Sequence, residues 1–279
     1  MWVKKGIIFN SEWAQLPVVD VYHDYYKIYY STRDEDGRSR PGAICVSKDL
    51  QKLLSHETIP LSLGQPGTFD SYGVMPSSIY TREEDGWKFM YYVGWSKRID
   101  VPYWNSMGLA MSTNGGITWT KCSKGPYLSS NPLEHGFIGT VELNTSNINE
   151  IYYSSAYWEK FDNKWEPIYD IKISRNGLVG ETILPLKENE GGIAAFRPLK
   201  DKFYYSKRNK LDYRTNPQNS YKIYSWDPKT NQETLELSPS EDEIMCAYPY
   251  IIEEKDKYIM FYNSDFGKSG IRYAIKWKI

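Results

Sequence analysis

The sequence predicts an all-β protein that forms one five-bladed β-propeller domain over residues 1–279, on three observations. First, the chain contains 25 Tyr, 10 Trp and 9 Phe, and aromatic residues favour strands over helices. Second, no segment of useful length carries a sustained apolar period of about 3.6 residues, which a helix would require. Third, a short aromatic strand recurs along the whole chain, which is typical of repeat architectures.

The recurring strand contains a tyrosine that marks each repeat unit. Successive marker tyrosines lie 62, 61, 52 and 57 residues apart, somewhat more than the roughly 40–50 residues of common propeller blades, which leaves room for functional loops. A β-sandwich also contains many short strands, but it does not predict five units with the same internal order. We expect the marker tyrosines to pack in the core between blades. They are Tyr30, Tyr92, Tyr153, Tyr205 and Tyr262.

A strand with a proline precedes the marker strand in four of the five units, and a third strand follows it. Proline is tolerated at the first residue of a strand, where the ladder needs no N–H donor. The prolines therefore predict strand starts, and the third unit has Gly139 to Leu143 at the corresponding place. The prolines are Pro17, Pro76, Pro198 and Pro249.

Residues 112–119 match the Asp-box pattern S-x-D-x-G-x-T-W, with Asn114 in place of the aspartate. This pattern predicts a hairpin in which the polar side chain accepts hydrogen bonds from the turn backbone and Trp119 packs inward. Its predicted role is structural.

Charge and motif content exclude several classes of partner. The 34 Lys and Arg nearly balance 35 Asp and Glu, for a formal net charge of −1, so no global field attracts nucleic acid or an anionic membrane. No window approaches the ~18 apolar residues of a membrane helix, and the apolar stretch after Lys5 is shorter than a signal-peptide core of roughly 7–15 residues. Three cysteines at no metal-ligand spacing suit a reducing compartment. We expect a cytoplasmic protein without membrane insertion, and no motif suggests a metal or cofactor.

Carboxylates near the predicted strand starts are the candidate catalytic residues, because the inner strands of a propeller line a central funnel. Glycosidic cleavage typically needs two carboxyl groups, roughly 5–5.5 Å apart for retention or 6.5–9.5 Å for inversion. A single loop carboxylate is most often a solvated surface group, but its recurrence around the ring favours a cluster. We interpret Asp70 as base, nucleophile or orienting acid, and Glu142, Glu190 or Glu243 as the acid.

Arginines and aromatic rings near the same strand ends are candidate contacts for substrate. A guanidinium fork suits carboxylate, phosphate or paired sugar hydroxyls; the alternative for Arg33 is a charged hairpin in which it pairs with neighbouring acids. Trp13, Tyr72, Trp95 and Trp104 can stack on the apolar face of a sugar. The predicted substrate-binding residues are Gln15, Arg33, Tyr72, His135, Arg197, Arg208 and Tyr248.

Several segments together resemble a known superfamily. They are AQLP at 14–17, IYYSTRD at 28–34, FDSYGVMPS at 69–77, FRP at 196–198 with YSKR at 205–208, and YPY at 248–250 with MFYN at 260–263. Over the whole chain they resemble the arabinanase/invertase-like five-bladed propeller glycosidases (glycoside hydrolase family 43/32-like). The resemblance is greatest to glycosyl-hydrolase-like proteins of bacterial surface-polysaccharide gene clusters. It implies a funnel active site with an acid on each of the first three blades. The chain departs from that pattern, since Leu16 replaces the acid before the first-blade proline, and Met75 and Ser77 flank the second-blade proline.

The predicted function is a carbohydrate-active enzyme that cleaves or transfers a glycosidic bond of a bacterial glycan. Two alternatives stay open at this point: a non-catalytic glycan-binding or polysaccharide-assembly propeller, and a phosphate-dependent glycoside phosphorylase in which cations hold phosphate. The first alternative needs aromatics and arginines but no carboxylate pair. The discriminating observation is whether two funnel carboxyl groups lie within about 10 Å of each other across a cavity.

Overall fold

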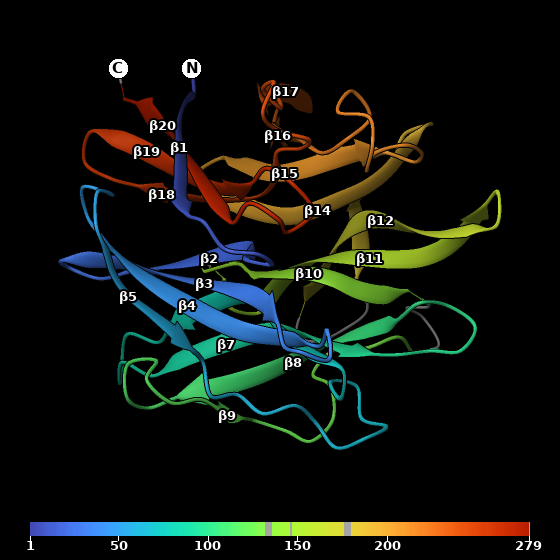
Figure 1. The fold of residues 1–279 in the computed structure, drawn as a ribbon, viewed down its shortest axis with the longest axis horizontal. Coiled ribbons are helices and arrows are strands. Elements are labelled where there is room, and N and C mark those ends of the chain that lie inside the picture. Colours follow the sequence, from blue (N-terminus) through green and yellow to red (C-terminus); the bar gives the residue numbers. More distant parts are fainter. Residues whose placement is uncertain (132–135, 146, 176–179, 279) are drawn as a thin grey trace.

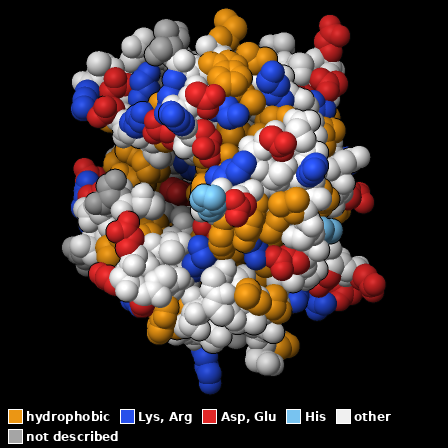
Figure 2. Space-filling model, turned by 90° about the vertical axis from the view of Figure 1, so that its left-hand side faces the viewer, with side chains coloured by type: hydrophobic (Ala, Val, Ile, Leu, Met, Phe, Trp, Pro, Cys, Tyr) orange, Lys and Arg blue, Asp and Glu red, His pale blue; other side chains and the backbone are white. Residues whose placement is uncertain are grey.

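The computed structural model describes residues 1–131, 136–145, 147–175 and 180–278, and every regular element in these ranges is a β-strand (Figure 1). The predicted all-β class is therefore confirmed for the part of the chain that is described. Within those ranges there is no helix that could cross a membrane. Figure 2 shows Lys and Arg side chains interspersed with Asp and Glu on one face, in keeping with the near-zero net charge.

The strands pair into five consecutive antiparallel groups of four. The first is β2 (Gln15–Val21), β3 (Tyr25–Arg33), β4 (Ser39–Ser47) and β5 (Leu53–Thr58); the second is β6 (Gly73–Thr81), β7 (Lys88–Ser96), β8 (Trp104–Ser112) and β9 (Thr120–Lys121). The third is β10 (Phe137–Leu143), β11 (Glu150–Phe161), β12 (Lys164–Arg175) and β13 (Glu181–Leu184); the fourth is β14 (Glu190–Leu199), β15 (Lys202–Asn209), β16 (Lys222–Asp227) and β17 (Gln232–Leu237). The fifth is β18 (Ala247–Glu253), β19 (Lys257–Asn263), β20 (Ile271–Trp277) and the N-terminal β1 (Val3–Phe9).

The first strands of the five groups lie side by side around the centre. β2 contacts β6, β6 contacts β10, β10 contacts β14, β14 contacts β18, and β18 contacts β2. The N-terminal strand β1 completes the last group by pairing antiparallel with β20, so the two ends of the described chain lie close together (Figure 1). The marker tyrosines all lie in the second strands, as the repeat predicts.

Each first strand carries a β-bulge. The register with the second strand shifts between Gln15 and Val18 in β2, and the other four first strands shift at comparable places. Within the bulges, Leu16, Ala195 and Tyr248 have φ angles of 56°, 54° and 56°, a left-handed conformation that non-glycine residues rarely adopt. Bulges of this kind often lie beside active sites, where they re-aim side chains.

The prediction that prolines start the first strands is wrong in detail. Pro17 and Pro249 lie inside the bulges of β2 and β18, and Pro76 borders the bulge of β6. A bulge interrupts the ladder, so the missing proline N–H costs no hydrogen bond there. Pro198 lies near the end of β14 instead.

Polar side chains of one group satisfy the backbone N–H groups that the bulges of the next group release. Ser77 Oγ accepts from Val141 N at 2.7 Å, and Thr140 Oγ1 accepts from Ala195 N at 2.8 Å. Because buried N–H groups are costly to leave unpaired, these contacts fix neighbouring groups against each other at the centre. Two further contacts of this type are Tyr248 N to Ser206 Oγ and Leu16 N to Asn263 Oδ1.

The marker tyrosines form part of the core, which confirms the prediction for them: each side chain is at most 2% exposed. Glycine on the third strand makes room for two of the rings. Gly42 lies opposite Tyr30 and Gly108 opposite Tyr92, and a Cβ atom at these glycines would come within 2.7 and 2.1 Å of the rings.

The Asp-box prediction is also confirmed. Asn114 Oδ1 accepts a hydrogen bond from Thr118 N at 2.9 Å, and Ser112 Oγ accepts one from Gly116 N at 2.9 Å. Trp119 is only 5% exposed. The turn contacts the first group through Tyr22, whose hydroxyl donates to the Gly115 carbonyl.

Candidate functional site

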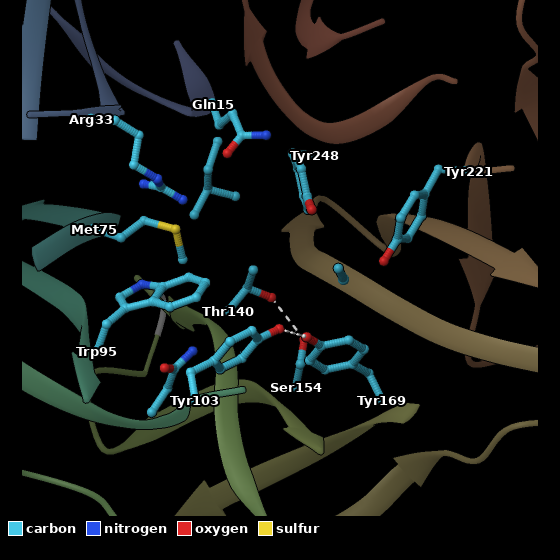
Figure 3. A pocket seen from close by; sticks show the side chains of 14 residues that line it. Gln15, Arg33, Met75, Trp95, Tyr103, Thr140, Ser154, Tyr169, Tyr221 and Tyr248 are labelled. Carbon is cyan, nitrogen blue, oxygen red and sulfur yellow. Dashed lines mark hydrogen bonds between the residues drawn. The ribbon is translucent and has the colours of Figure 1, made fainter. Parts of the chain in front are cut away.

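A cavity lies where the five first strands meet, and every group contributes to its lining (Figure 3). It encloses about 590 Å³ including its open mouth, which is within the roughly 300–1,000 Å³ of ligand pockets. The lining residues are Gln15, Leu16, Arg33, Met75, Trp95, Tyr103, Asn105, Gly139, Thr140, Ser154, Tyr169, Ala194, Tyr221 and Tyr248.

One wall of the cavity is aromatic. The Trp95 and Tyr103 ring centroids are 4.5 Å apart, and Trp158 lies 4.7 Å from Tyr103. Trp158 comes from the long β11–β12 hairpin and donates its indole N–H to the Tyr103 carbonyl at 3.0 Å. On the other side, the rings of Tyr221 and Tyr248 are 5.9 Å apart. Flat faces of this kind suit the apolar face of a sugar ring.

The polar groups of the cavity are mostly uncharged. The Tyr103 and Tyr169 hydroxyls lie 3.2 Å apart and point toward each other (Figure 3). Burial raises the pKa of both hydroxyls, so they stay protonated and act as hydrogen-bond donors and acceptors. Two buried atoms of lining residues, Trp95 Nε1 and Asn105 Oδ1, have no hydrogen-bond partner within the described ranges. Such orphaned atoms call for a partner, and a bound ligand supplies one.

Arg33 contributes the one charged side chain among the described lining residues. It ends β3, and its guanidinium carbon lies 5.7 Å from the Trp13 ring and 5.6 Å from the Trp95 ring. Its Nη1 donates to Ser31 Oγ at 3.1 Å and to the Thr32 carbonyl at 3.2 Å. Burial lowers the pKa of Arg33, because desolvation disfavours its charged form.

The alternative reading of Arg33 as part of a charged hairpin does not describe its contacts. The neighbouring acids pair with Arg38 instead: Arg38 Nε lies 2.9 Å from Asp34 Oδ2, and Arg38 Nη2 lies 2.8 Å from Asp36 Oδ2. No carboxylate of the described ranges pairs with Arg33. Its side chain is left facing the cavity.

Three of the predicted substrate-binding residues, Gln15, Arg33 and Tyr248, line the cavity. Tyr72 does not: with Trp104 it lines a neighbouring groove, where Lys97 Nζ lies 4.0 Å from the Tyr72 ring centre. His135 lies outside the described residues.

Arg208 lies behind the cavity rather than in its lining. It is 2% exposed, and its guanidinium donates to the Tyr221 hydroxyl at 3.1 Å and to the Pro167 and Asn209 carbonyls at 2.5 and 2.8 Å. With these donors occupied, Arg208 holds Tyr221 in place and does not present a free fork to a ligand.

Glu142 and Arg197 form an ion pair with each other. Both lie on first strands, but neither lines the cavity. Burial raises the pKa of Glu142 to about 7, although Arg197 acts in the opposite direction. Arg197 also covers the Tyr250 ring at 4.3 Å and donates to the Ser77 carbonyl at 3.2 Å. The pair therefore links β10 to β14, β6 and β18.

Asp70 is a partner of a marker tyrosine and does not line the cavity. It accepts a hydrogen bond from the Tyr92 hydroxyl at 2.9 Å and forms an ion pair with Lys121 at 2.5 Å. Its 2% exposure shows that the carboxylate is enclosed by its own group. This placement does not support Asp70 as base or nucleophile in the cavity.

Glu190 has a comparable structural setting. Lys207 Nζ lies 2.7 Å from Glu190 Oε1 and 2.7 Å from Glu233 Oε1, and Glu233 also accepts from the Tyr205 hydroxyl. Glu190 is thus part of an ion cluster beside a marker tyrosine, outside the cavity lining.

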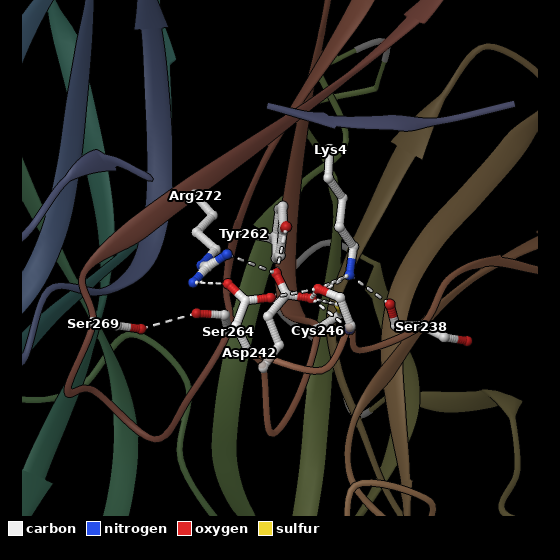
Figure 4. A network of polar contacts seen from close by, with 10 residues as sticks. Lys4, Ser238, Asp242, Cys246, Tyr262, Ser264, Ser269 and Arg272 are labelled. Atoms are coloured by element: carbon white, nitrogen blue, oxygen red, sulfur yellow. Dashed lines mark hydrogen bonds and ion pairs between the residues drawn. The ribbon is translucent and has the colours of Figure 1, made fainter. Parts of the chain in front are cut away.

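Glu243 lies in the junction between the N-terminal strand and the last group (Figure 4). It pairs with Lys4 of β1 and accepts from the Tyr262 hydroxyl at 2.7 Å, while Arg272 Nη1 lies 3.5 Å away. Desolvation would raise the pKa of Glu243, but Lys4 and hydrogen bonds from Ser240 and Tyr262 outweigh it and lower the pKa. The carboxylate holds the ring together and does not face the cavity.

The sequence search missed lining residues because it considered only the starts of first strands. Tyr103, Asn105 and Tyr169 lie at or in third strands. In an antiparallel group the second strand ends, and the third begins, at the end where the first strand starts. The residues flanking each second-to-third connection were therefore the usable signal.

Comparison with known proteins supplies the fold. No family model matches the chain. Two uncharacterized proteins of Mycobacterium tuberculosis, one from each of two strains, are 26% identical over 299 residues, which cover 98% of each chain. Three solved structures resemble it at 14–15% identity. They are the complex of BT0996 with RGII (TM-score 0.66, covering 99% of this protein and 92% of that one), the Bombyx mori GH32 beta-fructofuranosidase BmSUC1 (0.60; 95% and 60%) and a GH130 glycoside hydrolase that targets beta-1,2 mannosidic linkages in Candida mannan (0.54; 96% and 85%).

The chain has a glycosidase fold. The likeness covers nearly the whole chain, and it agrees with the superfamily that the strand segments resemble. Among the described residues, however, no Asp or Glu lines the central cavity, and no cluster of three His, Cys, Asp or Glu could hold a metal ion. The described cavity is therefore equipped to bind and orient a ligand through rings, neutral polar groups and one guanidinium.

Proposed function

We propose that this protein is a carbohydrate-active enzyme, a five-bladed β-propeller that binds a glycan in its central cavity. The observation that carries the proposal is the cavity itself. It lies at the centre of a glycosidase fold and combines the stacked rings of Trp95 and Tyr103 with unsatisfied polar atoms of Trp95 and Asn105.

The blade count rests on the pairing of the strands. Five four-stranded groups follow one another, and their first strands contact each other in a ring from β2 to β18 and back. A propeller has this arrangement, with inner strands around a central channel. A single domain over the whole chain follows from the same ring, because its last group needs the N-terminal strand β1.

Carbohydrate is the ligand class that the lining suits best. Sugars present alternating apolar faces and hydroxyl edges, and the cavity offers ring faces together with neutral donors and acceptors such as Gln15, Thr140 and the Tyr103 hydroxyl. The solved structures of similar fold include glycoside hydrolases, which supports the same ligand class.

The catalytic group is the less supported part of the proposal. Of the four predicted carboxylates, Glu142 is the one on a strand that also lines the cavity, and a pKa of about 7 suits a general acid at neutral pH. The absence of Asp and Glu from the described lining favours a second candidate, a glycan-binding propeller without turnover.

A binding and turnover panel tests the proposal. Aryl glycosides and bacterial oligosaccharides are offered to the protein with and without inorganic phosphate, and both bound and cleaved sugar are measured. We expect Trp95→Phe, which removes the orphaned indole donor, to weaken glycan binding by about threefold to tenfold. The matched control is Trp165→Phe, at a 39% exposed ring outside the cavity, which should bind as the parent does.

The outcomes separate the candidates. Turnover that is lost in Glu142→Gln, with binding retained, supports the enzyme and the assignment of its acid. Binding without turnover under any condition supports the glycan-binding candidate. No binding to any glycan, or equal binding by the parent and Trp95→Phe, contradicts a sugar site in this cavity.

A further inference from the structure

We propose that the glycan bound in the central cavity carries an anionic group, a carboxylate or a phosphate, and that the guanidinium of Arg33 holds it. This inference rests on the proposed function, since it specifies the class of sugar that the same cavity takes. It is argued from the pairing of the cations of the molecule, from the free edge of Arg33 and from the charge of the lining.

The buried cations of the described residues are paired or fully hydrogen-bonded, with Arg33 as the exception among arginines that face a cavity. Lys88 pairs with Asp20 at 2.7 Å, and Arg197 pairs with Glu142. Arg208 is satisfied by two carbonyls and a tyrosine hydroxyl. The remaining pairs are Lys27 with Glu57 and Lys207 with Glu190 and Glu233. Desolvated charges in proteins are normally compensated in this way.

The guanidinium of Arg33 has an unused edge. Both of its hydrogen bonds to the chain are made by Nη1, to Ser31 and to the Thr32 carbonyl, which leaves Nε and Nη2 without a partner in the described residues. These two N–H groups form the side of the fork that binds two oxygens of one carboxylate or phosphate. The Trp13 and Trp95 rings flank the guanidinium and restrain its orientation. In Figure 3 the side chain extends into the cavity.

The rest of the described lining does not oppose an anion. It contains no Asp or Glu, so no fixed negative charge repels a carboxylate or phosphate. The hydroxyls of Tyr103 and Tyr248 also line the cavity, and burial raises the pKa of both. They therefore remain protonated donors at neutral pH, able to hydrogen-bond an anionic oxygen.

Three sources would supply the same chemistry: the carboxylate of a uronic acid, the phosphate ester of a phosphorylated sugar, or inorganic phosphate bound beside a neutral sugar. All place two anionic oxygens against the Arg33 fork. The experiment therefore includes one arm for each source.

Binding is measured by glycan array and by calorimetry with matched probes: methyl glucoside against methyl glucuronide, glucose 6-phosphate, inorganic phosphate alone, and phosphate together with methyl glucoside. The array adds acidic and neutral bacterial oligosaccharides, so that the identity of the sugar is not fixed in advance. The variants are Arg33→Gln and Arg33→Lys. Arg38→Gln is the matched control, because Arg38 lies on the same hairpin but pairs with Asp34 and lies outside the cavity.

We expect the parent to bind acidic array members at least tenfold more tightly than their neutral counterparts. Arg33→Gln should lose ten- to hundredfold of that binding, Arg33→Lys should lose less, and Arg38→Gln should match the parent. A preference for one of the three anion sources identifies which of them the cavity takes. Thermal unfolding of each variant confirms that it is folded, and competition by phosphate against the parent tests the same contact without a mutation.

Equal binding of neutral and acidic sugars by the parent, unchanged in Arg33→Gln and not displaced by phosphate, would overturn the inference while leaving the proposed function standing. Failure of the parent to bind any sugar would overturn the proposed function itself. The two failures are thus distinguishable within one experiment.

Discussion

The surroundings of the marker tyrosines and the central cavity treat charge in opposite ways. Around Tyr92, Tyr205 and Tyr262, each carboxylate accepts from the tyrosine hydroxyl and pairs with a lysine of the chain: Asp70 with Lys121, Glu233 with Lys207, Glu243 with Lys4. In the cavity, Arg33 faces aromatic rings and neutral polar groups, with no acid beside it among the described residues.

The difference separates groups that serve stability from groups that serve recognition. A buried charge with a complete set of partners in the free protein has no unmet demand that a ligand could satisfy, whereas a half-buried charge without a counter-ion does. By this criterion, three of the four predicted catalytic carboxylates belong to the scaffold. The cation of the cavity belongs to the site.

The largest expected effect on stability comes from breaking the junction at Glu243. Glu243→Gln leaves Lys4 without its counter-charge and weakens the acceptor for Tyr262, so we expect a loss of roughly 3 kcal/mol at pH 7. That corresponds to a fall in Tm of about 6–12 °C, measured by calorimetry. Asp242→Asn, at a carboxylate that is 64% exposed, is the control and should change Tm little. Unchanged stability in Glu243→Gln would contradict a structural role.

The pH dependence of that loss sharpens the comparison. The folded pKa of Glu243 lies below its ordinary value of 4.5. Its contribution is therefore fully present above about pH 4.5 and is lost as the pH falls through the folded pKa. The difference in Tm between the parent and Glu243→Gln should be constant from pH 6 to 8 and shrink at acidic pH. A difference that grows on acidification would place the charge elsewhere.

A smaller effect is expected at Asp70. Asp70→Asn keeps an acceptor for the Tyr92 hydroxyl but removes the ion pair with the partly exposed Lys121, so we expect a loss of about 1–2 kcal/mol in the free energy of unfolding. Chemical denaturation measures it. Glycan binding and any turnover should be unchanged, and an activity lost without a loss of stability would return Asp70 to the catalytic machinery.

Features that repeat along the chain were predictable from the sequence. The five marker tyrosines and the Asp-box turn have local signals: an aromatic strand with a constant internal order, and a pattern in which Asn114 and Trp119 have fixed roles. The strand bulges were not predictable in this way, because a register shift depends on pairing with the next strand. Pro17 and Pro249 were therefore assigned to strand starts when they lie in bulges.

The site was predicted only in part, and the physical reason is the ambiguity of a carboxylate. An acid near a strand start serves equally well as a catalytic group or as an acceptor for a buried hydroxyl, and the sequence does not show which tyrosine lies beside it. Asp70, Glu190 and Glu243 proved to lie in such structural clusters. Gln15, Arg33 and Tyr248 were placed at the cavity because their strand ends meet there.

The most direct test of this account measures glycan binding and thermal unfolding together for the parent, Arg33→Gln and Glu243→Gln. The account predicts that Arg33→Gln loses ten- to hundredfold in affinity for the acidic glycan at an unchanged or higher Tm. Glu243→Gln should lose about 6–12 °C in Tm and, while folded, bind the glycan as the parent does. Loss of binding in Glu243→Gln at an unchanged Tm, with full binding in Arg33→Gln, would contradict it.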